Sequence, residues 1–327
     1  MALSMTQLEA ATEDFHMNTD PVDAYFTGNV LLYKLFKSGS EEKSYIAKTS
    51  ELVDGGDKIQ TFIEHDEANS GTYGNTTVIN QAKKDIINAA KFRWAGFYAS
   101  NTIDLKEQRN NSGAAQIVDL VWAKLRNIQK TIRKTMGAGI FAAAGTDTDA
   151  FIGLADLFST VTATAYGEIA EDDMAIWKAN VITTARAISF KVLQEIWRTP
   201  AMGQTRDQKP NLAITTESLK DGYEASLQTQ QRFQDQKLVD AGFDNVLFKG
   251  APIVADYNQT ATYFDALNTN YLCIKAHKDY NFTMPKWIAK QENGQPDVLT
   301  ANQRWSGQLV CSNRRAHVRH TNLTSPN

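Results

Sequence analysis

The sequence has few cysteines and no long hydrophobic run. Cys273 and Cys311 are the only two cysteines among 327 residues, too few for a disulfide framework, so we expect both to be reduced and buried. The longest apolar stretch, AGIFAAAG at 138–145, is far shorter than the roughly 20 residues that span a bilayer. The first 21 residues carry acids where a signal peptide carries a basic segment. We therefore expect no membrane partner and no secretion.

The chain also lacks a strong excess of charge of either sign. Lys and Arg together number 34 against 37 Asp and Glu, which gives a net charge of -3. A nearly balanced protein has no strong overall field that would recruit polyanions or an anionic membrane. Any contact with nucleic acid must therefore come from a local group of basic residues.

Complete cofactor motifs are missing as well. Gly137 and Gly139 begin like a dinucleotide fingerprint, but Ala142 stands where the third glycine is needed. DTDAFIG at 147–153 begins like a calcium loop, yet Phe151 replaces an oxygen ligand and Ile152 replaces the turn glycine. The sequence therefore predicts neither a cofactor nor a calcium site.

The segment GQLVCSNRRAHVRH at 307–320 could hold a metal through Cys311, His317 and His320. It lacks the paired spacing of a closed four-ligand site, and no fourth ligand lies nearby in the sequence. We interpret it instead as the closing strand of the fold, with its arginines available for ion pairs or phosphate.

A hydrolytic site is the alternative from another class of function. His65 in IEHDEA and the acids at 171–173 could supply a base and carboxylates, but no Ser or Cys stands in a nucleophile context. The acids precede MAIW, as acids precede a helix, so we interpret them as a helix N-terminus. We expect no enzymatic activity.

The clearest element is a long amphipathic helix at 113–136. At 1.5 Å per residue it would extend about 36 Å, which is long for a globular domain. Its apolar residues recur at spacings of three and four, which places them on one face: Ile117, Leu120, Val121, Leu125, Ile128, Ile132 and Met136.

The second half of this helix is basic, through Lys124, Arg126, Lys130, Arg133 and Lys134. Two interpretations are open. The cations can form a solvated face that the helix dipole favours near the C-terminus, or they can face a polyanion.

The remaining pattern is mixed helix and strand, which predicts an α+β fold. Residues 1–37 resemble an arm that begins polar and ends apolar. Two strand-like stretches flank the turn signal DGG, which predicts a long hairpin over about 38–78. A shorter helix ends before Pro200, and alternating apolar runs after residue 209 predict strands.

Taken in order, several segments resemble the major capsid proteins of tailed bacteriophages with the Hong Kong 97-type fold. In the C-terminal third they are AGFDNVLFKGAPIVADY, YFDALNTNYLCIKAHKDYNF and GQLVCSNRRAHVRH; upstream they are NVLLYKLF, LVDGGDKI and TAYGEIAEDDMAIWKANV. The likeness covers most of residues 20–320.

The resemblance implies a domain organisation. It comprises an N-terminal arm (1–37), an extended loop (38–78), a peripheral domain (79–199 and 296–327) with the spine helix at 113–136, and an axial domain (200–295). In this family the spine helix lies toward the shell interior, which favours packaged DNA as the partner of its basic half.

The implied function is that of a shell subunit of the virion, assembled in the host cytoplasm as hexamers and pentamers around double-stranded DNA. The implied partners are other copies of the chain, a scaffolding protein, a portal and a decoration protein. A cellular nanocompartment shell of the same fold, which encloses a cargo protein, is the alternative.

Overall fold

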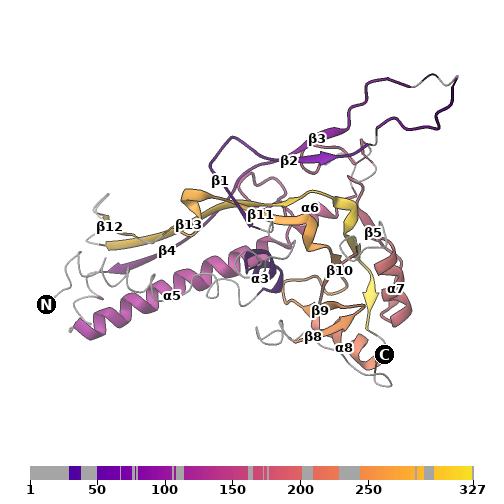
Figure 1. Cartoon of the computed structure of the whole chain (residues 1–327). Coiled ribbons are helices and arrows are strands. Elements are labelled where there is room, and N and C mark those ends of the chain that lie inside the picture. Colours follow the sequence, from indigo (N-terminus) through magenta and orange to yellow (C-terminus); the bar gives the residue numbers. More distant parts are fainter. Residues whose placement is uncertain are drawn as a thin grey trace.

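The computed structural model describes residues 29–37, 50–66, 68–75, 78, 80–104, 107, 114–160, 165–171, 173–174, 177–200, 209–227, 244–283, 286–290 and 298–325. Residues 1–28 of the expected arm and 38–49 of the expected loop lie outside this set. Figure 1 shows a long helix and a strand ribbon extending side by side away from a smaller sheet with its own helices. The chain is a mixed α+β protein, as the sequence predicts.

The long helix, α5 (Ala114–Gly139), packs against a two-stranded ribbon. The ribbon consists of β4 (Ala95–Asp104) and β13 (Val298–Cys311), which pair antiparallel along the whole of β4. On one face of β4, Ala95, Ala99 and Ile103 are buried and the positions between them are half-buried, whereas the other face is exposed, as expected of a strand with one face on a core. The apolar stripe that predicts the helix is therefore the side that the core covers.

A five-stranded sheet continues from this ribbon. Its strands run in the order β1 (Ser50–Val53), β11 (Leu272–His277), β13 and β12 (Lys286–Lys290), with β4 also paired to β13. The short helix α3 (Val30–Lys37) supplies buried leucines to the same core. Trp305 lies at its centre, within about 6 Å of the rings of Phe97 and Phe151.

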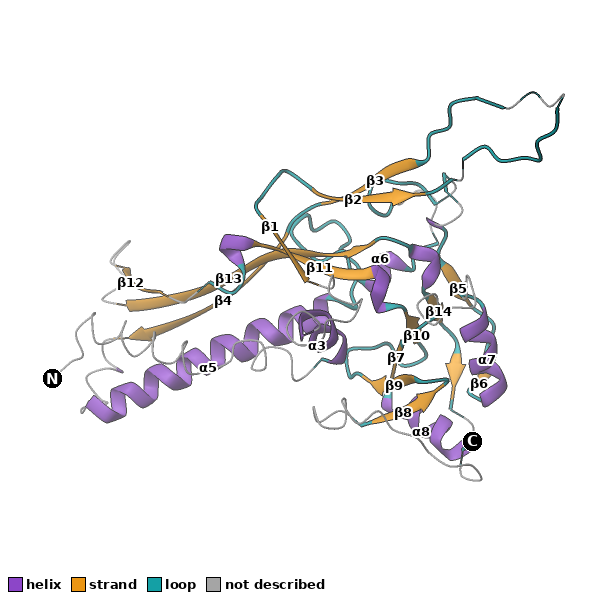
Figure 2. Cartoon of the chain, viewed as in Figure 1, coloured by secondary structure: helices purple, strands orange, loops and turns teal. Residues whose placement is uncertain are grey.

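A six-stranded sheet forms the second core. Its order is β5 (Asn180–Ile182), β14 (Val318–His320), β10 (Phe264–Leu267), β7 (Leu212–Thr215), β9 (Ala251–Ala255) and β8 (Asn245–Phe248). One face, including Ile214 and Leu267, packs on the first core. The other is covered by α7 (Phe190–Arg198) and α8 (Glu217–Ser226) (Figure 2). Trp197 of α7 and Tyr223 of α8 both pack against Phe248.

Three short elements complete the description. The helix α6 (Leu154–Leu157) follows the loop after α5. The strands β6 (Arg186–Ala187) and β15 (Leu323–Thr324) pair in parallel beside α7. Within the described residues, no helix combines the length and apolar composition that a bilayer crossing requires.

The hairpin predicted around DGG is wrong in its strand pairing. The strand before the turn, β1, pairs in parallel with β11, whereas β2 (Ile59–Glu64) pairs with β3 (Ile87–Phe92), and the loop between them projects from the body (Figure 1). Gly55 and Gly56 have φ of 137° and 113°, a backbone that favours glycine. An isolated hairpin is marginally stable, so β1 gains more by joining the edge of a sheet that has a core.

The segment 307–320 is not one closing strand. β13 ends at Cys311, a 3-10 turn occupies Arg314–Ala316, and β14 then enters the six-stranded sheet. The pattern of apolar and polar residues does not reveal this transfer, because the residues before and after the turn are both buried. The first group lies in the five-stranded sheet and the second in the six-stranded sheet.

The predicted domain boundaries stay predictions, and sheet membership crosses them. β11 and β12 fall within the expected axial range, 200–295, yet they belong to the sheet of β4 and β13. Conversely, α7 and β14 fall in the expected peripheral ranges but pack on the second core. Strand pairing between distant segments, which local sequence cannot specify, decides this arrangement.

Candidate functional site: the basic face of the long helix

The long helix α5 has one buried face and one open face. Its buried residues recur along one stripe and pack toward the β4–β13 ribbon: Val121, Leu125, Ile128, Ile132 and Met136. At 3.6 residues per turn, each residue is displaced by about 100°, so the opposite side of the helix carries a different set of positions. That side carries most of the basic residues in the second half of the helix.

Three of the five predicted basic residues share the open face. Arg126, Lys130 and Lys134 follow one another at intervals of four, all three are exposed, and none makes an ion pair with a described residue. Arg133 is half-buried beside them. These cations therefore form a row along the helix, which we call the basic row (Arg126, Lys130, Arg133, Lys134).

Lys124 does not belong to this row. Its Nζ lies 3.4 Å from Glu107 Oε2 and donates to the carbonyl oxygen of Thr102 at 3.1 Å. The side chain points along the flank toward β4 and is largely neutralised there. The structure thus separates one of the five predicted residues from the others.

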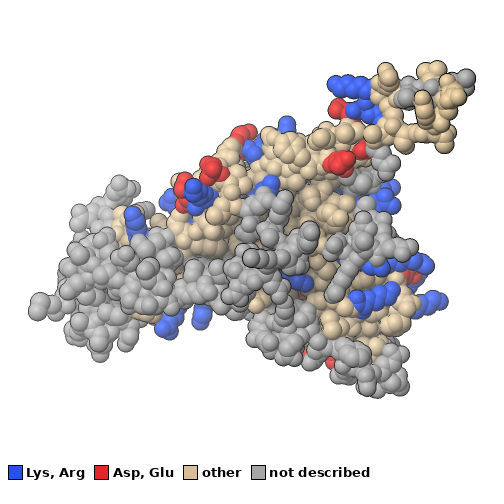
Figure 3. Space-filling model, viewed as in Figure 1, with Lys and Arg blue, Asp and Glu red and all other residues tan. Residues whose placement is uncertain are grey.

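Every charged residue of α5 from Leu120 onward is basic. No Asp or Glu occurs between Leu120 and Gly139, and the Arg126 guanidinium stacks over the Trp122 ring at 5.9 Å. Figure 3 shows Lys and Arg side chains on the underside of the molecule, where α5 runs. Such a row can bind phosphate without reading sequence, because phosphate contacts carry no base information.

The candidate metal ligands serve another purpose. The ring of His317 accepts a hydrogen bond at Nδ1 from the Asn268 amide at 3.1 Å, and its Nε2 lies 3.5 Å from Cys311 Sγ. Burial lowers the pKa of His317 to about 3 and raises the pKa of the Cys311 thiol. In the described part of the chain, no three His, Cys, Asp or Glu side chains form a group that could hold a metal ion.

Two arginines of the closing segment are occupied rather than available. The buried Arg314 guanidinium donates to backbone carbonyls, including those of Leu157, Trp177 and Ser159. Arg319 forms a two-bond ion pair with Asp265. Of the three arginines expected to be available, Arg315 alone is exposed.

The residues of the hydrolase alternative are also engaged locally. Glu171 Oε1 accepts from the Ala179 amide at 2.8 Å, and Asp173 Oδ2 accepts from the Ala170 amide at 3.3 Å. Residues 172, 175 and 176 lie outside the described residues, so the expected helix N-terminus stays a prediction. His65 lies directly after β2, at the base of the projecting loop.

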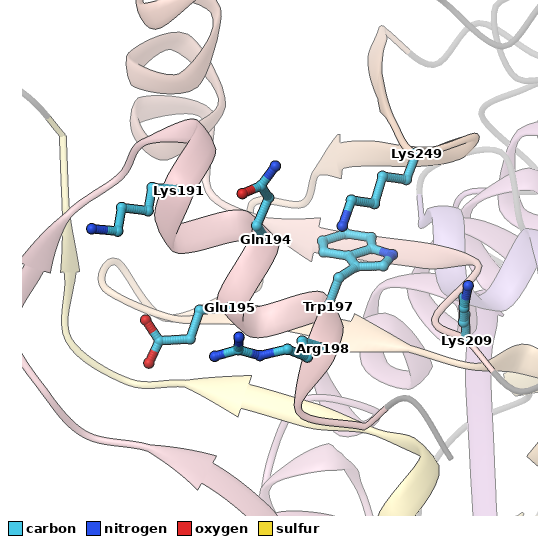
Figure 4. A pocket seen from close by; sticks show the side chains of 7 residues that line it. All are labelled: Lys191, Gln194, Glu195, Trp197, Arg198, Lys209 and Lys249. Carbon is cyan, nitrogen blue, oxygen red and sulfur yellow. The ribbon is translucent and has the colours of Figure 1, made fainter. Parts of the chain in front are cut away.

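A second group of cations was not predicted. Lys191, Arg198, Lys209 and Lys249 surround a depression of about 600 Å³ beside Trp197, on the six-stranded sheet (Figure 4). They come from three separate segments, so no local run of charge in the sequence indicates them.

Comparison with known proteins identifies the fold. No protein-family model and no curated protein matches the chain by sequence. Among solved structures, the capsid asymmetric unit of cyanophage A-1(L) superposes with a TM-score of 0.65 at 14% identity, over 86% of this chain and 92% of that one. The satellite phage P4 procapsid including its size determination (Sid) protein gives 0.52 at 13%, over 91% of both chains.

A third structure has a different role. The holo-SrpI encapsulin complex from Synechococcus elongatus PCC 7942 matches with a TM-score of 0.54 at 7% identity, over 86% of both chains. In each case the likeness covers most of this chain. This chain therefore has the Hong Kong 97-type fold of the tailed-phage capsid proteins.

Proposed function

We propose that this chain is the major capsid protein of a tailed bacteriophage, which assembles into the hexamers and pentamers of an icosahedral shell. The observation that carries the proposal is the match of nearly the whole chain to phage capsid subunits, with 86% of this chain and 92% of the cyanophage subunit aligned. The chain then resides in the virion and assembles in the host cytoplasm. Its role is structural rather than enzymatic.

Exposed apolar side chains on the projecting hairpin support a role in assembly. Phe62 and Ile87 are 74% and 59% exposed, and the pairing register places them on the same face of β2 and β3. Large apolar groups on a protruding hairpin are typical of a contact surface. In the shell, this hairpin clasps a neighbouring copy of the chain.

The basic row of α5 faces the enclosed double-stranded DNA. Three of its cations, Arg126, Lys130 and Lys134, have the exposure and uniform sign that nonspecific phosphate binding needs. Replacing Arg126, Lys130 and Lys134 with Ala should leave shells intact but make them retain less DNA than the original protein as the salt concentration rises. The control Lys124→Ala should retain as much DNA as the original protein. Normal retention in the triple variant would refute the assignment.

Other virion components complete the assembly. A scaffolding protein, a portal and a decoration protein are the partners that a shell of this kind requires. The P4 procapsid contains a size determination protein. Coexpression with neighbouring genes would reveal which of these partners this chain needs.

The second candidate is the shell of a cellular nanocompartment, which the match to the encapsulin complex supports. A nanocompartment encloses a cargo protein, whereas the basic row favours nucleic acid. Shells purified from the native source separate the two candidates by their content, DNA or protein.

Assembly itself is tested by sedimentation and electron microscopy of the expressed chain, alone and with its upstream neighbour. We expect closed shells or rings of subunits. A monomer of about 36 kDa under every condition, including with a scaffolding partner, would contradict the proposal.

A further inference from the structure

The six-stranded sheet carries opposite charge at its two ends. β7 and β9 run parallel, so both begin at one end of the sheet and finish at the other. Lys209 precedes β7 and Lys249 precedes β9, which places both cations at the starting end. Glu217 follows β7, and Asp244 precedes the antiparallel strand β8, which places both acids at the finishing end.

The starting end forms a basic depression. Lys191 and Arg198 of α7 join Lys209 and Lys249 around its rim, and all four are exposed (Figure 4). Among the described residues that line it, Glu195 is the one acid, and this carboxylate is already paired with Arg186. No described residue forms an ion pair with any of the four cations, so the described residues of the depression carry a net charge of about +4.

The finishing end forms an acidic surface. The Glu217 and Asp244 carboxylates hold the buried Lys220 amine between them at 2.6 and 2.7 Å, yet their side chains stay 66% and 65% exposed. Asp221, one turn further along α8, is exposed as well. With three acids and one lysine, the described residues of this end carry a net charge of -2.

The two ends are too far apart to neutralise each other. Strands of four and five residues at about 3.3 Å per residue separate them by roughly 15 Å, whereas charges in solution are screened over about 10 Å at 0.1 M salt. Each end therefore presents its charge outward. The same chain offers both halves of a complementary contact on opposite sides of one sheet.

We propose that, in each ring of subunits, the basic depression of one copy receives the acidic end of the next copy. The inference rests on the proposed shell function, because a head-to-tail contact between unlike surfaces closes into a ring when the rotation allows it. Because every copy carries both surfaces, the number of acidic ends equals the number of basic depressions. Charge complementarity also fixes which side of each subunit meets the next.

Charge reversal at either end tests this contact. The basic-end variant carries Lys191→Glu, Arg198→Glu and Lys209→Glu, which changes that end from about +4 to -2. The acidic-end variant carries Glu217→Gln and Asp221→Lys, which changes that end from -2 to +1. A matched control, Lys191→Arg with Arg198→Lys and Lys209→Arg, keeps the charge.

Each reversed variant is expected to fold, with a cooperative melt, but to form neither rings nor shells. A mixture of the two variants is expected to form hexamers in which the variants alternate. It forms no pentamers, because an odd ring cannot alternate, and hence no closed shells. One chain with both ends reversed is expected to restore closed shells, and the control assembles normally.

Three results would overturn the contact. One is normal shells from a folded basic-end variant. Another is that neither the mixture nor the doubly reversed chain assembles, although every variant folds. The variants compared for folding include one that carries Asp221→Lys alone. The third is normal assembly with lower binding of DNA or inorganic phosphate, which would make the depression an anion site. Failure of the unchanged protein to assemble would count instead against the proposed function.

Discussion

A buried ion pair between β10 and β14 makes the strongest prediction about stability. Asp265 is fully buried and lies directly opposite Arg319 in the strand register, with Oδ1 and Oδ2 2.6 and 2.7 Å from Nε and Nη2. Gln259 donates to the same carboxylate at 2.7 Å. The guanidinium lies 4.6 Å from the ring of Phe158 and 4.9 Å from that of Tyr263. Neither charge can reach water without opening the sheet.

Asp265→Asn keeps the shape of the side chain but removes its charge. The Arg319 cation is then left buried without a counter-charge, which costs about 3–5 kcal/mol. That loss is a large share of the roughly 5–15 kcal/mol that stabilises a typical domain. The double change Asp265→Leu with Arg319→Met removes both charges, and it is expected to come within about 1 kcal/mol of the original protein or to exceed its stability.

The assay is urea-induced unfolding, followed by tryptophan fluorescence at concentrations below those that form shells. The single variants Asp265→Leu and Arg319→Met, together with the double variant, complete a double-mutant cycle, which isolates the coupling between the pair. A free energy of unfolding for Asp265→Asn within about 1 kcal/mol of the original would refute the reasoning, because the pair would then not be sealed from solvent.

Three further predictions address the helix, the hairpin and acid stability. Ile128→Ala in the buried stripe of α5 should lower the free energy of unfolding by about 2–5 kcal/mol in the same urea assay, whereas Lys130→Ala on the open face should change it little. Replacing residues 65–86 with a short Gly-Ser linker should leave a cooperative melt but abolish closed shells, and normal shells would exclude the clasp. Because the folded pKa of His317 is about 3, below the ordinary value near 6.5, the unfolded chain binds its proton first. Stability should therefore fall by up to about 1.4 kcal/mol per pH unit from pH 6.5 toward 3, a slope that His317→Gln should flatten.

The sequence predicts elements whose signals are local. The stripe from Val121 to Met136 is periodic and continuous, so the helix is found with its start displaced by one residue and its end by three. The stop before Pro200 holds for α7, which begins after the Ser189 cap. The partner of β1 could not be predicted in this way, because β11 lies more than 200 residues further along the chain.

The candidate site is predictable to a similar extent. A run of cations on one helix is visible in the sequence, and helical spacing alone suggests that Arg126, Lys130 and Lys134 align. The ion pair between Lys124 and Glu107 is not visible in the sequence, because it depends on the packing of α5 beside β4. The depression at Lys191 and Lys249 was missed because strands far apart in the sequence bring its cations together. Arg314 appeared free for phosphate, but its burial among backbone carbonyls depends on tertiary structure.

The passage from β13 to β14 has a mechanical consequence. One continuous stretch of chain is a strand in both sheets, and at the crossing Arg314 holds carbonyls from both Leu157 and Trp177. Bending the subunit between its sheets would break these buried bonds, each of which is expensive to leave unmade. We therefore expect this crossing to resist bending between the two sheets. If the chain builds the proposed shell, pressure from its contents should fall on the contacts between subunits, so a swelling shell should rotate its subunits rather than flex them.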